Sequence, residues 1–461
     1  MTPDARLLTP ALSPLEKALR PLRWRAWQAF RDLEARQHPL RAIFWETTHR
    51  CNLQCGHCGS SCGPRKAPPE ELTTGQILAA IRTIAEDLDY AKAARSTPGR
   101  TGPSERASPS VSYLPPGQPR APGLPNLPVS FYVTGGEPLL REDLFEVTSE
   151  MHALGFDWGM VTNGTLVTGD LVARCRRAGM NTVTVSLDGL QDSHDRLRGA
   201  GTFRRTRRAV ELFLAEAGIG SIQTVEVATC VNRLNIGELE DMRDLWAAVG
   251  IHHWRLIQTS AIGRAAANRD LLLRGSDLRR LLEFIKENRK VSATPASSVN
   301  PHRRQQRPQP WMSLDEEGYL GRAWEGQVRE PLFYCPAGIT VGSILYDGAI
   351  GACPSLPRNL VQGNIAEHRF MQVWNEGYAV FRDRSWMRTG ACASCRHWGD
   401  CRGNSLHLWD FKEHRTGLCH LYLLAEAGAT QGAGARASGN PDTSPRKPGV
   451  EPSSTGCGRA R

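Results

Sequence analysis

This sequence lacks any apolar run long enough to span a membrane, and its first residues lack the apolar core of a signal peptide. From these two absences we expect a soluble protein of the cytoplasm. Lysine is scarce beside arginine, and no recognised nucleic-acid-binding motif accompanies the net charge of +10. We therefore expect neither a membrane nor a nucleic acid among the partners.

Cysteine, by contrast, is abundant, with 13 residues in a chain of 461. In a secreted protein this number would suggest disulfides. Here the thiols cluster at metal-ligand spacing and no signal sequence precedes them, which favours reduced thiolates on iron. Cys175, Cys230 and Cys457 fall outside the clusters, and we expect them to be inert core or tail thiols.

The densest cluster consists of Cys51, Cys55 and Cys58, directly after the apolar segment 42–48. A loop with this C-x3-C-x2-C spacing can turn three sulfurs toward one cubane iron–sulfur cluster, because thiolates are the preferred ligands of such irons. Three ligands leave one iron open to bind a small molecule. Two alternatives remain, a zinc knuckle, although no second C-x2-C pair lies nearby, and a saturated cluster that Cys62 completes.

A second motif, Gly135-Gly136-Glu137-Pro138, follows the apolar segment 129–133. Two consecutive glycines let the backbone approach a ligand closely, because no Cβ stands in the way. Taken alone, the motif is equally typical of a tight turn between a strand and a helix.

Strand-like and helical patterns alternate through the first two-thirds of the chain. Strands are predicted near 42–48, 129–134, 157–162, 181–187, 223–231 and 253–258. Helices are predicted near 72–90, 141–154, 168–178, 202–218 and 236–249. This alternation predicts an α/β fold of parallel strands with crossover helices.

The cysteine triad followed by the glycine motif resembles the signature of radical S-adenosylmethionine (SAM) enzymes. The resemblance implies an incomplete (β/α)6 TIM-type barrel whose site lies at the C-terminal ends of the strands. It implies a [4Fe–4S] cluster on Cys51, Cys55 and Cys58 with SAM at the open iron. His57 would lie beside the adenine of SAM.

The resemblance assigns roles to further polar positions. Residues near the amino group of SAM would be Gly135, Gly136, Glu137 and Pro138. Asn163 closes the third strand, Ser186 and Asp188 would lie near the ribose or the substrate, and Arg198 near the SAM carboxylate. An arginine suits a carboxylate because its fork donates two parallel hydrogen bonds. Read without the resemblance, Asp188 is equally typical of a turn.

A second cysteine constellation follows, and its members are Cys335, Cys353, Cys392, Cys395, Cys401 and Cys419. It resembles the SPASM extension of peptide-modifying radical SAM enzymes, which carries auxiliary [4Fe–4S] clusters. The resemblance implies an outer cluster on Cys392, Cys395, Cys401 and Cys419, and an inner one on Cys335 and Cys353. A zinc ribbon is the alternative for these six thiols.

Two positions depart from that pattern. Ser405 stands where a cysteine ligand of the inner cluster is expected. The inner cluster would then use the serine oxygen or another side chain, stay partly open for substrate, or be absent, since a hydroxyl binds iron less well than a thiolate. Pro354 stands where sulfatase-maturating relatives place an aspartate base, so formylglycine formation by that mechanism is not expected.

The expected domain organisation has five parts. They are a helical arm at 1–40, the partial barrel at 41–260 with a disordered insertion at 92–128, a helical and linker region at 261–330, a SPASM-like domain at 331–425 and a disordered tail at 426–461. Residues 295–312 in particular resemble a linker.

The resemblance implies an enzyme that reductively cleaves SAM to a 5′-deoxyadenosyl radical, which removes hydrogen from a substrate. The expected substrate is a peptide or small protein, and the expected electron donor is a flavodoxin or ferredoxin. A haem or other tetrapyrrole precursor is the alternative substrate. A non-catalytic electron-transfer protein, with a cluster closed by Cys62, is the alternative outside enzymes.

Overall fold

The computed structural model describes residues 14–64, 68, 70–88, 129–217, 221–292, 310–314, 318–329 and 332–426. The predicted insertion at 92–128, and the predicted tail beyond residue 426, lie outside these described residues. In the part that is described, no helix is long and apolar enough to cross a membrane.

The centre of the molecule is one curved sheet of ten strands, in the order β10-β9-β8-β1-β2-β3-β4-β5-β6-β7. Neighbouring strands from β8 through β1 to β7 are parallel, while β9 and β10 are antiparallel to their neighbours. The strands are β1 (Ala42–Glu46), β2 (Ser130–Thr134), β3 (Asp157–Thr162), β4 (Thr182–Ser186), β5 (Thr224–Val231), β6 (His253–Gln258), β7 (Trp311–Leu314), β8 (Val341–Ile344), β9 (Ala349–Gly351) and β10 (Gly363–Asn364). All six predicted strands are thereby confirmed.

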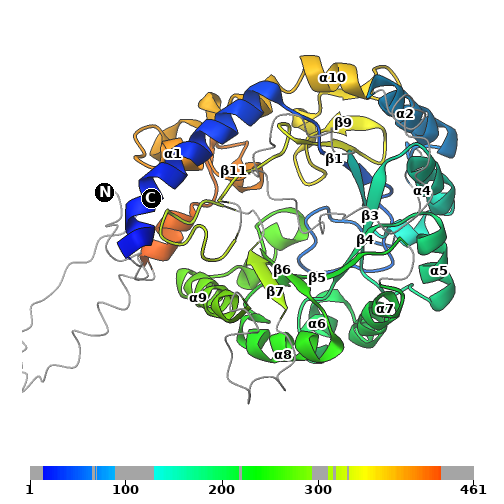
Figure 1. Ribbon diagram of the computed structural model, residues 1–461, viewed down its shortest axis with the longest axis horizontal. Coiled ribbons are helices and arrows are strands. Elements are labelled where there is room, and N and C mark those ends of the chain that lie inside the picture. Colours follow the sequence, from blue (N-terminus) through cyan, green and yellow to red (C-terminus); the bar gives the residue numbers. More distant parts are fainter. Residues whose placement is uncertain are drawn as a thin grey trace, which may run out of the picture.

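Helices surround this sheet on its outer side, and α2, α4, α5, α7, α8 and α9 follow one another around it in chain order (Figure 1). The barrel helices are α2 (Thr74–Asp87), α4 (Leu144–Ala153), α5 (Gly169–Arg177), α6 (Gln191–Arg198), α7 (Thr202–Glu216), α8 (Leu239–Val249) and α9 (Gly275–Ser292). The predicted α/β fold with parallel strands and crossover helices is confirmed. The barrel is incomplete, because β7 at one edge and β10 at the other have no pairing with each other among the described residues.

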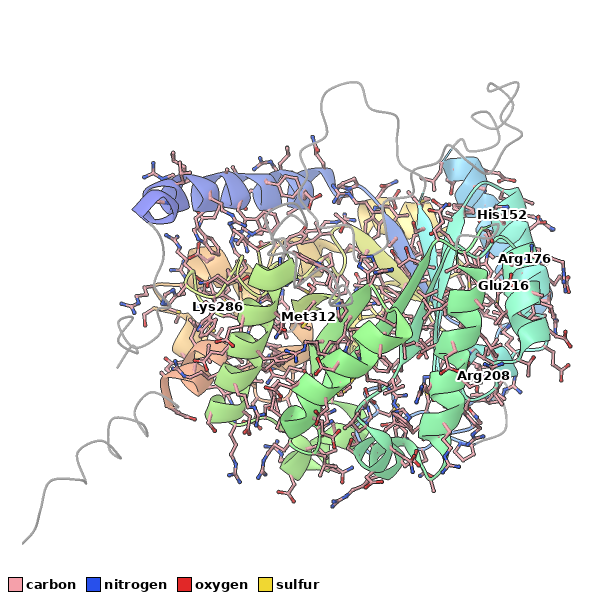
Figure 2. All side chains as sticks on the ribbon, turned by 60° about the horizontal axis from the view of Figure 1, so that its bottom comes forward. His152, Arg176, Arg208, Glu216, Lys286 and Met312 are labelled. Carbon is pink, nitrogen blue, oxygen red and sulfur yellow. The ribbon has the colours of Figure 1, made fainter. Side chains whose placement is uncertain are left out.

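Local sequence explains where these helices begin and which face they bury. Helix α2 starts at a capping box, in which the Thr73 side chain accepts from the Gln76 amide and the Gln76 side chain accepts from the Thr73 amide. Its buried face consists of Ile77, Ala80, Ile81, Ile84 and Ala85, at helical spacing. The side of the helix layer that faces away from the sheet is polar. Arg176 of α5 and Glu216 of α7 form an ion pair there (Figure 2).

One expected linker is partly a strand. Trp311 and Met312, the last residues of the expected linker at 295–312, begin β7, which pairs in parallel with β6. Met312 is buried, and Arg289 of α9 stacks on the Trp311 ring. The expectation of a linker failed because a strand of four residues is too short to show an alternating apolar pattern in the sequence. The strand is stabilised instead by its pairing with β6.

The C-terminal domain is built from short elements that cover one end of the barrel. They include α10 (Phe370–Glu376), α11 (Ala379–Arg382), α12 (Trp398–Cys401), β11 (Trp409–Asp410) and β12 (Arg415–Thr416). Its strands β8 and β9 form a hairpin, and β8 pairs with β1 of the barrel. The two domains therefore share one sheet, which fixes the C-terminal cysteines against the barrel.

The expected N-terminal arm is helix α1 (Pro14–Gln37), which lies along the C-terminal domain in Figure 1. Trp24 and Trp27 are buried in the common core, whereas Leu22 is 62% exposed. Arg31 donates to the backbone carbonyls of Gly399 and Asp400. The arm thus packs against the segment that carries Cys401.

Candidate cluster and cofactor site

The predicted triad lies in the loop that follows β1. Cys51 and Cys55 are buried and Cys58 is half-buried, and together with Leu53 and Cys62 they form a small cluster separate from the main core. The loop is closed at its base, because the Cys51 amide donates to the Gly63 carbonyl over 2.9 Å. The three sulfurs are therefore gathered on the inside of one loop, as their spacing predicts.

The Gly135-Gly136 pair packs directly against this loop. The Gly136 amide donates to the Thr48 carbonyl over 2.7 Å, and the Glu137 amide donates to the Arg50 carbonyl over 2.9 Å. A Cβ on Gly136 would lie 1.9 Å from the Arg50 oxygen, and Gly135 has a φ of +135°. The two glycines are thus required for the contact with the cysteine loop. Their predicted contact with SAM stays a prediction.

Glu137 organises the ends of β2 and β3. It is fully buried, and its carboxylate accepts from the Thr162 hydroxyl and the Asn163 amide, each over 2.8 Å. Burial raises the pKa of this carboxyl above its usual value. The Asn163 side chain in turn donates to Asn52 over 2.9 Å and lies 3.8 Å from the Cys51 sulfur. Glu137 and Asn163 therefore connect the glycine motif to the triad, while Pro138 begins the short 3-10 helix that follows.

Asp188 is the electrostatic centre of the site. Its Oδ2 lies 2.8 Å from His57 Nε2 and 2.5 Å from Arg198 Nε, and its Oδ1 accepts from the Cys230 amide over 2.7 Å. Burial would raise the pKa of Asp188, but the charges of Arg198 and His57 hold it well below the usual range. Asp188 is thus more than a turn residue, because it ties the cysteine loop to α6. The predicted contacts of His57 and Arg198 with SAM stay predictions.

Cys230 was not expected at the site. Its potential ligand atom and those of His57 and Asp188 all lie within 4.8 Å of one another, and it lines the central cavity. A cation at this point would be repelled by Arg198, so the three groups form a polar wall and not a metal site. The sequence signal that was overlooked is the place of Cys230 at the C-terminal end of β5. Cys175, in contrast, is buried in the apolar core, as expected.

Cys62 lies next to the triad. It is buried, and its thiol donates to the Ser60 carbonyl over 3.8 Å. The neighbouring Cys62 side chain lowers the pKa of Cys58. Burial raises the pKa of Cys51 to about 11, although the hydrogen bond from the Leu53 amide acts in the opposite direction. Three soft donors in one loop fit a cubane cluster. Cys62 is the neighbouring thiol that experiment must distinguish from them.

The four cysteines predicted for the outer cluster come together in the C-terminal domain. Burial raises the pKa of Cys392, Cys401 and Cys419, and close neighbouring sulfurs of the same group, Cys395 among them, raise it further. Such mutual repulsion between thiolates is relieved by a shared cationic metal centre. The geometry therefore fits an auxiliary cluster on these four residues.

The inner group combines Cys335 and Cys353 with two residues of the segment after α12. Cys353 Sγ lies 3.4 Å from His407 Nε2, a contact that the sequence did not suggest. Burial would raise the pKa of Cys335, but Arg384 and His407 lower it to about 7. Ser405 is 1% exposed, and its hydroxyl has no hydrogen-bond partner among the described residues.

A cavity of about 290 Å³ lies between the strand ends and the C-terminal domain. Its walls include Gly135, Ser186, Arg198 and Cys230 of the barrel, and Cys335, Cys353, Ser405 and His407 of the inner group. A second cavity, of about 460 Å³, shares Glu46, Ser60, Pro354, Ser355 and His407 with the first. Three of the predicted cofactor residues, Gly135, Ser186 and Arg198, thus border the same space as the inner cysteines.

Comparison with known proteins identifies both halves of this arrangement. Residues 126–245 match the family model of the radical SAM superfamily, and residues 335–396 match that of the SPASM iron–sulfur cluster-binding domain. The chain therefore contains a radical SAM domain followed by a SPASM domain, which confirms the resemblance seen in the sequence and the expectation of an enzyme. Its cofactors are SAM and [4Fe–4S] clusters.

Curated relatives cover most of the chain. The AdoMet-dependent heme synthase of Oleidesulfovibrio alaskensis is 26% identical over 81% of this chain and 84% of its own length. The mycofactocin maturase MftC of Mycobacterium ulcerans is 27% identical over 82% of this chain and 86% of its own length.

Solved structures show the same fold at lower identity. Streptococcus suis SuiB bound to S-adenosylmethionine superposes with a TM-score of 0.53 at 17% identity, covering 80% of this chain and 73% of that one. The enzyme anSMEcpe with bound AdoMet and Cp18Cys peptide superposes with a TM-score of 0.56 at 16% identity. The superposition covers 86% of this chain and 97% of that chain. These likenesses establish the fold of the described residues.

Proposed function

We propose that this radical SAM enzyme modifies a peptide or small protein. The observation that carries the proposal is the shared cavity, in which barrel residues such as Ser186 and Arg198 face the inner cysteines of the SPASM domain. At about 290 Å³ its volume lies just below the range for pockets that enclose a whole small molecule, about 300–1,000 Å³. One side chain of a longer substrate fits such a space, with the rest of the peptide in the adjoining cavity.

In this proposal Cys51, Cys55 and Cys58 hold the SAM-binding cluster. When bound, cluster and SAM supply a 5′-deoxyadenosyl radical that removes hydrogen from the substrate. The chain itself supplies position: Gly136 and Glu137 anchor the cysteine loop, and Asp188 fixes Arg198 for an anionic group such as a carboxylate. The barrel and the SPASM domain line the cavity from two sides, which would limit the access of water to the reacting groups.

An electron must reach the cluster from outside the chain, and we include a flavodoxin or ferredoxin as its source in the proposal. Reduced thiolates on iron persist in a reducing compartment, which supports a cytoplasmic location. The name of the maturase MftC, a relative over 82% of this chain, supports the choice of a peptide.

A tetrapyrrole is the second candidate substrate, because three relatives are named as AdoMet-dependent heme synthases and a fourth as an Fe-coproporphyrin III synthase. The carboxylates of such a molecule would meet Arg198 in the cavity wall. Its ring would have to occupy both adjoining cavities at once.

The test uses anaerobically reconstituted protein with dithionite and SAM. We expect release of 5′-deoxyadenosine by the unaltered chain and none by Cys51→Ala. Adding a precursor peptide encoded beside the gene should stimulate this release and change the mass of the peptide. Stimulation by iron coproporphyrin III, with no effect of the peptide, would replace the first candidate with the second.

A further inference from the structure

We propose that His407 is an iron ligand, and that Cys335, Cys353 and His407 bind the inner auxiliary cluster through three protein side chains. The proposal concerns the position at which Ser405 replaces the expected cysteine. It rests on the radical SAM and SPASM assignment and does not depend on the substrate.

The first argument is the contact between His407 and Cys353. The Nε2 atom lies 3.4 Å from the sulfur, although the two residues are 54 positions apart in the chain. The 3-10 helix Leu406–Leu408 carries His407 to this point, immediately after Ser405. Imidazole nitrogen and thiolate sulfur bind iron in one cluster where histidine replaces cysteine. A ligand that the sequence lacks at position 405 is thus supplied two residues later.

The second argument is the state of Ser405. Its side chain lines the cavity, is almost fully buried and has no hydrogen-bond partner among the described residues. A buried hydroxyl without a hydrogen-bond partner destabilises the fold, so such a group calls for an explanation. A bound group in the space between Ser405, Cys335 and Cys353 would provide that partner. Ser405 is a weaker iron donor than His407, and we assign it a neighbouring position.

The third argument is the support beneath these ligands. The buried Arg384 donates to the Cys335 carbonyl over 3.1 Å and to the Asn404 carbonyl over 3.3 Å. It therefore connects the segment of Cys335 to the segment of Ser405 and His407. A buried guanidinium beside the Cys335 side chain also offsets negative charge, as groups around a metal site commonly do. The three ligands are held together before any metal arrives.

Three protein ligands leave one iron of a four-iron cluster without a protein donor. The same cavity reaches Ser186 and Arg198 of the barrel, so a substrate in that cavity borders the inner cluster. An oxygen, nitrogen or sulfur atom of the substrate would complete the coordination. The inner cluster would then bind substrate directly as well as take up an electron.

The experiment detects nitrogen on iron spectroscopically, without reference to turnover. We would label the chain with ¹⁵N-histidine, replace Cys51, Cys55 and Cys58 by alanine to remove the SAM-binding cluster, and omit SAM so that its amino group contributes no nitrogen. Electron–nuclear double resonance on the reduced protein should then show a ¹⁵N coupling. In His407→Ala this coupling should disappear. In His407→Cys it should also disappear while the iron content stays at about eight per chain, which separates loss of the ligand from misfolding.

The matched control is His368→Ala, because His368 is an exposed histidine of the same domain. We expect its ¹⁵N coupling and iron content to equal those of the labelled parent. The proposal is overturned if the ¹⁵N coupling persists in His407→Ala or is missing from the labelled parent, which is the chain with the three triad cysteines replaced. An iron content of about four per chain in this parent also overturns it. The proposed function fails separately, if the unaltered chain releases no 5′-deoxyadenosine.

Discussion

Arg198 and Asp188 form a buried ion pair, with Nε of Arg198 2.5 Å from Oδ2 of Asp188. The same oxygen meets His57, which lies in the cysteine loop beside Cys58. One carboxylate therefore links the loop that binds the cluster to helix α6. Removing it leaves a guanidinium in the interior with no opposing charge.

The substitution Asp188→Asn should therefore lower the free energy of unfolding by about 3–5 kcal/mol, because breaking one side of a buried pair strands the other. Thermal unfolding under anaerobic conditions measures the loss. Asp192→Asn is the matched control, since Asp192 is exposed in the first turn of α6, close to Asp188 in the chain. Equal melting temperatures for the two variants would contradict the role given to Asp188.

The close packing of the glycine motif yields a second prediction. A methyl group at position 136 would overlap the Arg50 carbonyl, so Gly136→Ala should displace the cysteine loop. We expect the purified variant to lose about four iron per chain and all SAM cleavage. Gly169→Ala should lose neither, because no atom lies within 4 Å of a Cβ at that helical position. Full iron content in Gly136→Ala would show that the loop tolerates the shift.

Cys62 distinguishes an open cluster from a saturated one. If Cys51, Cys55 and Cys58 are the only protein ligands, Cys62→Ala should retain the cluster and release 5′-deoxyadenosine on reduction. Cys51→Ala should lose about four iron and all release. Added SAM should also change the electron paramagnetic resonance signal of Cys62→Ala. Loss of the cluster in Cys62→Ala would identify a fourth protein ligand.

The pH dependence of stability depends in part on His194. Burial, with a smaller effect of Arg198, lowers the pKa of this histidine to about 4, and its Nδ1 accepts from the Asp188 amide. The folded pKa lies below the unfolded value of about 6.5, so the unfolded state binds the proton first as the pH falls. Stability should thus decline from about pH 6.5 and reach its full loss, at most about 3 kcal/mol, near pH 4.

The substitution His194→Asn keeps a hydrogen-bond acceptor and removes the titrating group. Its stability relative to the unaltered chain should therefore rise as the pH falls from 7.5 to 5.0. Denaturant unfolding of both proteins at the two pH values measures this difference in the free energy of unfolding. The similarly buried His420 titrates in both proteins, so its contribution cancels from the difference. A difference that does not change with pH would mean that His194 carries no such linkage.

Local sequence determined the parts of this protein that depend on spacing alone. The C-x3-C-x2-C loop, the glycine pair and the six alternating strands follow from a few neighbouring residues, and each was predicted. The C-terminal thiols were predicted as groups for the same reason, since Cys392, Cys395 and Cys401 are close in the chain. A resemblance to known enzymes then supplied the chemistry that these groups perform.

Tertiary structure decided which distant residues meet. His407 reaches Cys353, Cys230 reaches Asp188, and β7 and β8 extend the two sides of the barrel sheet, none of which a local pattern reveals. The ion pair of His57 with Asp188 likewise joins the cysteine loop to the end of β4. Such contacts are set by the closure of the fold, because burial and charge act between residues that are near in space and far apart in the chain.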